Sequence, residues 1–153
     1  VRAEAEALSG GRHQISLDAD DGFDLLGADA EIASAFGNLA TNAVRYTPPG
    51  GAVLLVWRAS PSGAEFAIED NGMGIAPEHI PRLTERFYRV DHGRSRESGG
   101  TGLGLAIVKH ALARHQATLG IQSEPGKGSR FSARFPSHRV VPEPSRVASS
   151  TPT

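Results

Sequence analysis

Two glycine-rich stretches separated by a long polar segment constrain this chain more than any other feature. They are residues 70–75 (DNGMGI) and residues 99–105 (GGTGLGL). Asp70 ends an alternating run in which Phe66 and Ile68 have the same parity, so its carboxylate is expected to face the same buried side. A buried carboxylate needs a hydrogen-bonding partner. The first stretch therefore predicts a recognition site at the end of a strand.

The glycines in both stretches predict that a ligand approaches the backbone. Gly72 and Gly74 carry no side chain just beyond Asp70, which leaves room for a flat group. Gly102 and Gly104 open a predicted apolar helix, and the freed N–H groups at a helix N-terminus form an anion site. We therefore expect a nucleotide, with its base read by Asp70 and its phosphates near Gly102 and Gly104.

Composition narrows the class of protein. A chain of 153 residues is long enough for one domain with its own core, and 39% hydrophobic and 22% charged residues are typical of globular proteins. The net charge of -1 gives no reason to expect nucleic-acid binding. The absence of cysteine excludes disulfides and thiolate metal sites. The longest apolar run, residues 53–57, is far shorter than the ~20 residues of a membrane span.

Hydrophobic periodicity predicts mixed helices and strands. Helices are expected at residues 1–8, 29–45 and 102–114, and strands at 13–18, 23–27, 53–59, 64–70, 117–123 and 128–135. The strand at 23–27 is expected to pair with that at 13–18 after a turn at 20–22. Residues 76–100 show little periodicity, which is typical of a functional or disordered loop. Beyond Pro136 the Ser, Pro and Thr content predicts a disordered tail.

The helix at 29–45 carries a polar stripe beside its apolar one. Asn38, Asn42 and Arg45 lie on this stripe, roughly 120° around the axis from the apolar residues. A lone asparagine in a helix is most often a solvated surface residue. A stacked pair with a basic residue one turn later instead favours a site, because an amide oxygen is a suitable ligand for a Mg²⁺ ion that keeps its waters and phosphates.

Two common phosphate motifs do not fit the chain. The Walker phosphate loop needs a Ser or Thr after its Lys, whereas Lys127 is followed by Gly128 and the glycine spacing is one residue too long. The dinucleotide fingerprint, G-x-G-x-x-G, directly follows a strand, whereas the second glycine-rich stretch lacks the third glycine and follows a long loop. Both of these nucleotide-binding classes are therefore set aside.

The order of four motifs resembles the catalytic domain of sensor histidine kinases. Residues 38–48 (NLATNAVRYTP) are similar to the N box, 70–75 to the first glycine box, 86–89 (RFYR) to the F box and 100–105 to the second glycine box. The resemblance covers roughly residues 19–135. It implies the Bergerat fold of the GHKL superfamily, an α/β (α+β) two-layer sandwich in which a mixed, mostly antiparallel sheet packs on three helices and a long ATP lid covers the site.

The resemblance implies that ATP and Mg²⁺ are bound and gives roles to individual residues. Asp70 would accept a hydrogen bond from the adenine amine, and Asn42 would ligate Mg²⁺ with Asn38 beside it. Arg45, where the family usually has Lys, would contact phosphate. Tyr46 would pack against the nucleotide, Arg89 would reach the terminal phosphate from the lid, and further contacts are expected from Gly72, Gly74, Ile75, Thr101, Gly102, Leu103, Gly104 and Leu105. The residues expected to serve catalysis are Asn38, Asn42, Arg45 and Arg89.

Residue chemistry favours phosphoryl transfer over hydrolysis. ATP-hydrolysing relatives place a Glu one turn before the metal-binding Asn, and here Asn38 holds that place and cannot act as a base. Glu31 lies two turns earlier, about 10 Å along the axis. None of the histidines has the neighbouring acid and proline of the family's phosphoacceptor, and all six are interpreted as ordinary surface or strand residues: His13, His79, His92, His110, His115 and His138.

The sequence therefore predicts a protein histidine kinase whose acceptor lies elsewhere. Residues 12–136 are expected to be its catalytic ATP-binding domain, 1–11 the junction from a dimerisation and phosphoacceptor domain, and 137–153 a disordered tail. Expected partners are that acceptor domain and a cognate response regulator. This fragment is expected to be a monomer and the parent a homodimer, with the domain on the cytoplasmic side of a membrane-anchored bacterial sensor.

Two alternative functions stay open. One is a degenerate module that binds ATP without transferring phosphate. The other is a related serine kinase acting on an anti-sigma antagonist, against which Phe87 and Tyr88 of the F box argue.

Overall fold

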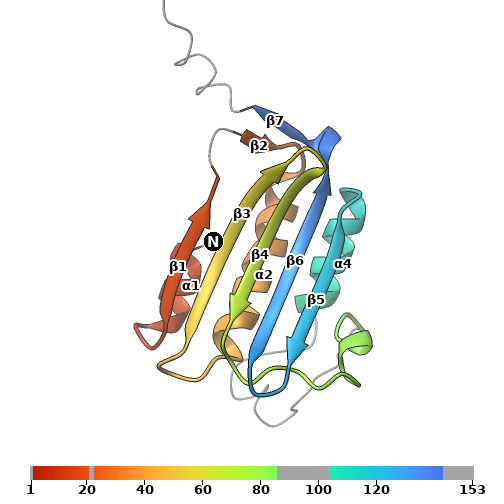
Figure 1. Ribbon diagram of the computed structural model, residues 1–153. Helices are drawn as coiled ribbons and strands as arrows, with labels where there is room; N and C mark the ends of the chain where they lie inside the picture. Colours follow the sequence, from red (N-terminus) through yellow and green to blue (C-terminus); the bar gives the residue numbers. More distant parts are fainter. Residues whose placement is uncertain (1, 21–22, 86–103, 143–153) are drawn as a thin grey trace, which may run out of the picture.

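A five-stranded sheet organises the chain (Figure 1). The computed structural model describes residues 2–20, 23–85 and 104–142. The strand order is β1-β3-β4-β6-β5, with β1 parallel to β3 and the other pairs antiparallel. The strands are β1 (Gln14–Ala19), β3 (Ala52–Ser60), β4 (Gly63–Asp70), β5 (Thr118–Glu124) and β6 (Gly128–Pro136). This is the mixed, mostly antiparallel sheet that the sequence predicts.

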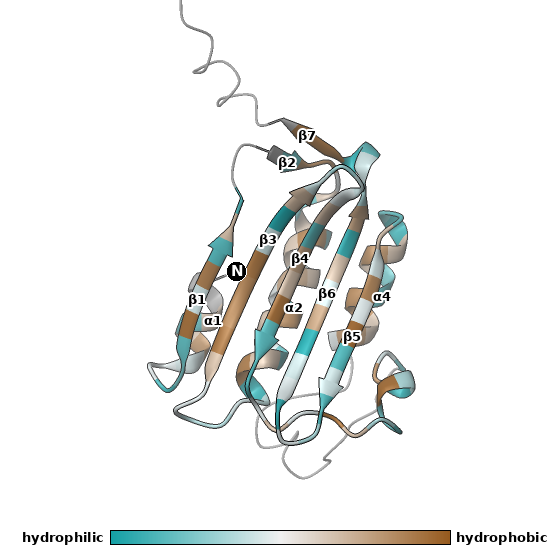
Figure 2. Cartoon of the chain, in the orientation of Figure 1, coloured by the Kyte–Doolittle hydropathy of each residue, from teal (hydrophilic) through white to brown (hydrophobic). Residues whose placement is uncertain are grey.

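Helices cover one face of this sheet. They are α1 (Arg2–Ser9), α2 (Asp29–Arg45) and α4 (Gly104–Arg114), all of which lie behind the strands in Figure 1. Alternate strand residues such as Leu55 and Ile68 meet Leu39 of α2 and Val108 of α4 in the core. Figure 2 shows this apolar character along β3 and on α2. Within the described ranges, no helix is long and apolar enough to span a bilayer.

Helix α1 is part of this helical layer. It packs against α2, and its Ala5 and Ser9 side chains are buried. The small residues of α1 thus contribute to the core beside β1, and the assignment of residues 1–11 to a junction stays a prediction.

The short strand β2 (Phe23–Leu25) corrects the expected pairing near the N-terminus. It pairs antiparallel with β7 (Val140–Pro142), not with β1. Strand β1 instead pairs with β3, and the Asp20 carboxylate accepts the Ala59 N–H over 3.0 Å. A strand of only three residues shows too little alternation to reveal its partner.

The pairing of β2 with β7 also shows that the first residues of the tail predicted to be disordered, 137–142, are ordered. A 3-10 helix, η2 (Ser137–Arg139), leads into β7. The Leu26 N–H donates to the Arg139 carbonyl over 2.7 Å, and the Arg139 guanidinium donates to the Leu26 carbonyl over 2.9 Å. Residues 137–142 are therefore held by contacts with a segment more than 110 positions earlier, while residues 143–153 lie outside the described part.

One histidine expected at the surface or in a strand is buried. His115 follows α4 and is 4% exposed. Its Nε2 accepts the Ala28 N–H at the start of α2 over 3.0 Å, while Nδ1 donates to the Ala111 carbonyl over 2.7 Å. The ring thus satisfies a backbone donor at a helix N-terminus where no side chain of α2 does so. This position could not be recognised from sequence, because its partner is 87 residues away.

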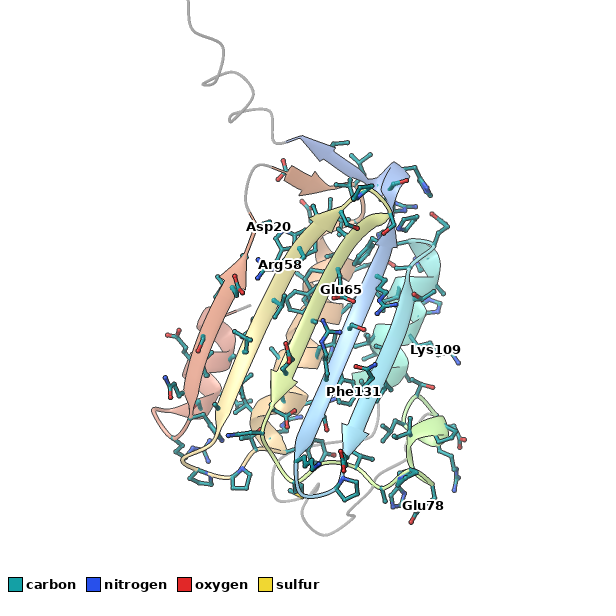
Figure 3. All side chains as sticks on the ribbon, in the orientation of Figure 1. Asp20, Arg58, Glu65, Glu78, Lys109 and Phe131 are labelled. Atoms are coloured by element: carbon teal, nitrogen blue, oxygen red, sulfur yellow. The ribbon has the colours of Figure 1, made fainter. Side chains whose placement is uncertain are left out.

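Charged residues are paired across the sheet face opposite the helices. Glu65 of β4 accepts hydrogen bonds from Arg130 over 2.7 Å and Arg134 over 2.8 Å, both on β6. On the other side of β4, Arg58 of β3 pairs with Asp18 and Asp20. Figure 3 shows Asp20, Arg58 and Glu65 on this face. The side chain of Arg130 is the main cause that holds the pKa of Glu65 below its ordinary value, and Arg134 adds to it.

Glu65→Gln is therefore expected to lower the free energy of unfolding by about 1 kcal/mol at neutral pH. Because the folded pKa lies below the unfolded one, this contribution is complete above the ordinary carboxyl pKa and is lost as pH falls through the lowered value. Urea denaturation of wild type and variant across pH 2–7 measures the difference. Glu69→Gln is the control, since the Glu69 side chain is 47% exposed and lies 3.9 Å from Arg130. An equal effect of both changes would contradict the assignment.

Candidate functional site

The first glycine-rich stretch lies against the end of α2. Tyr46 caps that helix, and its carbonyl lies 2.4 Å from the place where a Cβ on Gly72 would stand. The Met73 N–H reaches the same carbonyl at 3.5 Å. The fold therefore brings the predicted N box and first glycine box into direct backbone contact.

Asp70 ends β4 with its carboxylate partly withdrawn from solvent, as the alternation with Phe66 and Ile68 predicts. Its Oδ1 accepts the Gly72 N–H over 2.9 Å. Burial raises the pKa of Asp70, and hydrogen bonds from the backbone N–H groups of Gly72 and Ser129 oppose that rise. The Asp70 carboxylate is therefore a hydrogen-bond acceptor that backbone N–H groups hold in place and that is partly shielded from solvent.

The turn between β5 and β6 supports this stretch from below. The Gly126 N–H donates to the Met73 carbonyl over 2.8 Å. A Cβ on Gly74, whose φ is +71°, would lie 2.1 Å from the Glu124 carbonyl oxygen. A Cβ on Gly128, whose φ is +130°, would lie 2.0 Å from the Asp70 carbonyl oxygen. Both residues must therefore be glycine for the first glycine-rich stretch to pack against the β5–β6 turn.

This contact changes the reason given for two glycines. From sequence, Gly72 and Gly74 were expected to leave room for a flat ligand. In the structure, the space next to their α-carbons is taken by the carbonyls of Tyr46 and Glu124. Sequence alone could not distinguish these reasons, because the chain segments that fill the space are distant in sequence.

The start of α4 meets the polar stripe of α2. A Cβ on Gly104 would lie 3.0 Å from Asn38 Oδ1, and the Asn38 amide donates to the Ser34 carbonyl over 2.8 Å. Ile75 is 8% exposed, and Leu105 packs against the core. Four of the predicted site residues lie outside the described part: Arg89, Thr101, Gly102 and Leu103.

Arg45 contains an unsatisfied donor. Its Nε, in the last turn of α2, is buried and has no hydrogen-bond partner among the described residues. A buried donor without a partner is rare in folded proteins. A bound anion would satisfy it, because guanidinium groups bind anions well. Asn42 lies one turn earlier, and no side-chain hydrogen bond is formed by it within the described residues. Asn42 and the Nε of Arg45 thus form no side-chain hydrogen bond with the described residues, whereas Asn38 does, and their role in binding a ligand stays a prediction.

Sequence reasoning missed the polar residues that anchor these segments. Thr47 donates to the Ala43 carbonyl over 2.7 Å and presents its own carbonyl to His13 Nε2 at 2.5 Å. His13 Nδ1 in turn lies 2.9 Å from Ser9 Oγ. Ser129 faces Asp70 across the β4–β6 pairing. The pairing of strands was the one signal available for Ser129, and no local pattern pointed to the contacts that join Thr47, His13 and Ser9.

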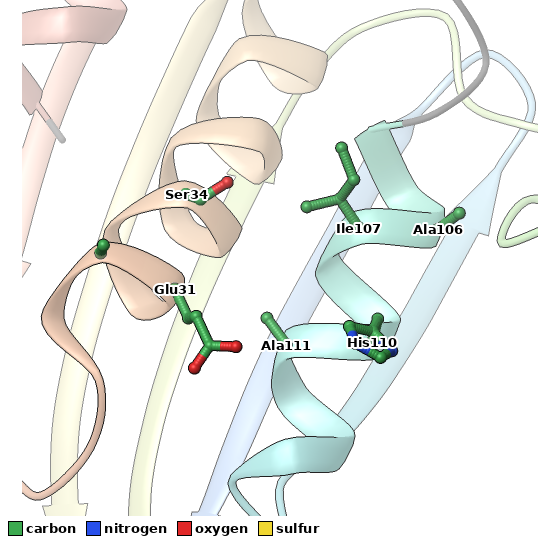
Figure 4. Close-up of a pocket in the computed structure, with 7 residues that line it drawn as sticks. Glu31, Ser34, Ala106, Ile107, His110 and Ala111 are labelled. Atoms are coloured by element: carbon green, nitrogen blue, oxygen red, sulfur yellow. The ribbon is translucent and has the colours of Figure 1, made fainter.

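A groove between α2 and α4 lies beside this site (Figure 4). Its volume is about 630 Å³, and its lining includes Ser34 and Glu31 on α2 and Ile107 and His110 on α4. None of its lining residues belongs to the predicted nucleotide site. Among the described residues, no cluster of three or more His, Asp or Glu side chains could hold a metal ion.

Comparison with known proteins agrees with these motifs. Residues 27–139 match the family described as histidine kinase-, DNA gyrase B- and HSP90-like ATPases. The chain is 55% identical over 142 residues to the phosphate regulon sensor protein PhoR of Pseudomonas aeruginosa, covering 92% of this chain and 32% of that protein. It thus spans about a third of the length of that relative.

Solved structures of sensor kinases share the fold. The mycobacterial sensor histidine kinase MprB superposes with a TM-score of 0.76 at 26% identity, covering 92% of this chain and 93% of that one. Full-length ShkA in complex with AMPPNP gives 0.73 at 30% identity, covering 88% and 28%. The five-stranded, mostly antiparallel sheet with helices on one face is therefore the Bergerat fold of these kinases, and the chain belongs to the family of histidine kinase-, DNA gyrase B- and HSP90-like ATPases.

Proposed function

We propose that this chain binds Mg-ATP and donates its γ-phosphoryl group to a histidine on a separate phosphoacceptor domain. The observation that carries the proposal is the buried Nε of Arg45, which has no partner in the described part of the chain and lies on the same helix stripe as Asn42. That stripe ends at Tyr46, whose carbonyl meets the stretch that follows Asp70. The end of α2 therefore connects Arg45, a donor suited to an anion, with the stretch that follows Asp70, an acceptor suited to the amine of a base.

In this proposal, different described residues contact the base, the phosphates and the metal ion of the nucleotide. The Asp70 carboxylate accepts from the adenine amine, and Arg45 donates to phosphate. Asn42, with Asn38 beside it, offers an amide oxygen to Mg²⁺. A bound Mg²⁺ would neutralise phosphate charge. The AMPPNP held by ShkA supports an adenine nucleotide as the ligand.

The arrangement of acidic residues supports transfer over hydrolysis. Glu31 is engaged by Arg114 of α4, with Oε1 to Nε at 2.5 Å. Asn38 contacts Gly104 and its own helix. Neither residue offers a free carboxylate to activate water at Asn42. Phosphoryl transfer to a positioned nucleophile requires alignment and charge neutralisation rather than such a base on this domain.

The test is transfer of radiolabelled phosphate from γ-labelled ATP to a separately produced dimerisation and phosphoacceptor domain of a sensor kinase. We expect label on the acceptor that is lost in acid and stable in base, as for phosphohistidine. Acid-stable label would instead support the serine-kinase alternative. Tight Mg-ATP binding without transfer to any supplied acceptor would support the binding module.

Asn42→Asp is expected to weaken Mg-ATP binding about tenfold or to abolish transfer. It keeps an oxygen at the site but adds a negative charge next to the phosphates. Calorimetry and the transfer assay measure the two effects. Gln122→Glu, an equal change of charge at an exposed position of β5, is the matched control. Wild-type behaviour of Asn42→Asp would remove Asn42 from the site.

The proposal extends to the longer protein. Because the relatives are sensor proteins of which this chain covers about a third, we infer that the parent is a homodimeric sensor that passes phosphate to a response regulator. The domain would then lie on the cytoplasmic side of a membrane anchor.

A further inference from the structure

A serine on β5 connects the two halves of the predicted base site. Ser123 Oγ accepts the Ile75 N–H over 2.8 Å, directly after the first glycine-rich stretch. The same hydroxyl lies 3.1 Å from the Gly128 carbonyl and 2.7 Å from Ser129 Oγ. One side chain therefore contacts the end of the stretch that begins at Asp70 and the strand that faces Asp70.

The hydrogens at this serine can be assigned by counting. Ser123 has one hydroxyl hydrogen, which it donates to the Gly128 carbonyl. Its lone pairs then accept the Ile75 N–H and the Ser129 O–H. All three bonds are satisfied at once, so the hydroxyl orientation is determined by its neighbours.

The hydrogen bonds of Ser123 support both backbone segments that donate to the Asp70 carboxylate. Ser129 provides a backbone N–H to the Asp70 carboxylate, and Ser129 is held by the Ser123 hydroxyl. On the other side, the Asp70 carboxylate accepts from Gly72, and the stretch that contains Gly72 ends at Ile75. Without the Ser123 hydroxyl, the Ile75 N–H next to a buried side chain would lose its acceptor.

We propose that Ser123 is a positioning residue of the nucleotide site, whose hydroxyl fixes the stretch between Asp70 and Ile75 against the β5–β6 hairpin so that Asp70 meets the adenine amine. The proposal rests on the function proposed above. Because the effect acts on the base and not on the phosphates, Mg-ATP and Mg-ADP should be affected equally.

Calorimetry of both nucleotides tests the role with three variants of the whole chain. Ser123→Ala is expected to weaken ATP and ADP by the same factor, about threefold to tenfold, the equivalent of one lost hydrogen bond. Ser123→Thr keeps the hydroxyl and is expected to restore affinity to within about twofold of wild type. Ser132→Ala is the control, because Ser132 is a buried serine on the same hairpin that lies against Gly120.

Amide hydrogen exchange of Ile75 in the nucleotide-free chain tests the bond itself. The exchange rate of the Ile75 amide should rise about tenfold in Ser123→Ala and stay unchanged in Ser132→Ala. The exchange rate of the Ala67 amide, in the middle of β4, should not change in Ser123→Ala. Unchanged exchange at Ile75, or unchanged affinity of Ser123→Ala beside a wild type that binds, would overturn the positioning role alone. A wild type that binds neither nucleotide would overturn the proposed function, and this role with it.

Discussion

Asp70→Asn is expected to weaken Mg-ATP binding tenfold to a hundredfold. The change removes an ionised acceptor for the adenine amine from a partly buried site, which costs on the order of 1.5–3 kcal/mol. Titration calorimetry of Mg-ATP and of ADP into both proteins measures the loss. Glu69→Gln is the matched control, since it removes the same charge from the neighbouring exposed residue of β4. Equal affinity of wild type and Asp70→Asn would place the adenine elsewhere.

The raised pKa of Asp70 adds a pH dependence to this result. Nucleotide binding needs the ionised carboxylate, so affinity should fall as pH drops through the pKa of Asp70, which burial raises above its ordinary value. Stability of the nucleotide-free chain should change in the opposite sense. Because the folded state holds this proton more tightly than the unfolded state, the contribution is complete below the ordinary pKa and is lost as pH rises through the raised one. Asp70→Asn should remove both dependences.

Gly128→Ala is expected to be the most destabilising single change described here, at about 3–5 kcal/mol. An L-residue at φ +130° is strained, and its Cβ would lie 2.0 Å from the Asp70 carbonyl oxygen, which is backbone and cannot rotate away. The loss of packing at Asp70 should also abolish nucleotide binding. Urea denaturation and calorimetry measure the two effects.

Gly126→Ala isolates the steric part of this effect. Gly126 lies in the same turn with φ +81°, but no atom of the described residues lies within 4 Å of the place of its Cβ. It should therefore lose only about 1–2 kcal/mol through backbone strain. If both variants lost the same stability, the close approach of Gly128 to Asp70 would not be an energetic feature of the fold.

Elements with long periodic patterns were predictable from sequence. The helix at 29–45 and both hairpins follow from repeated apolar spacing, and they appear as α2, β3 with β4, and β5 with β6. Asp70 was predictable as well, because its position depends on alternation within one strand. The four-motif resemblance to sensor kinases then supplied the layer arrangement, which periodicity alone did not.

What escaped prediction depends on contacts between segments distant in sequence. The parallel pairing of β1 with β3, the β2–β7 ribbon and the buried ring of His115 each join residues that share no local pattern. The same holds for Ser123, which resembles any serine in an edge hairpin until the Ile75 N–H is placed beside it. Arg45 was predicted as a phosphate contact, and that role stays a prediction.

The glycines at 74 and 128 have a consequence for how relatives of this chain are diagnosed. Since each is required by a neighbouring carbonyl of the protein itself, selection for folding alone would retain them after nucleotide binding had been lost. A pseudokinase of this family should therefore keep its glycine signature and diverge first at positions such as Asn42 and Arg45, whose side chains form no hydrogen bond with the described residues. Motif searches weighted towards the glycines would count such inactive proteins as enzymes.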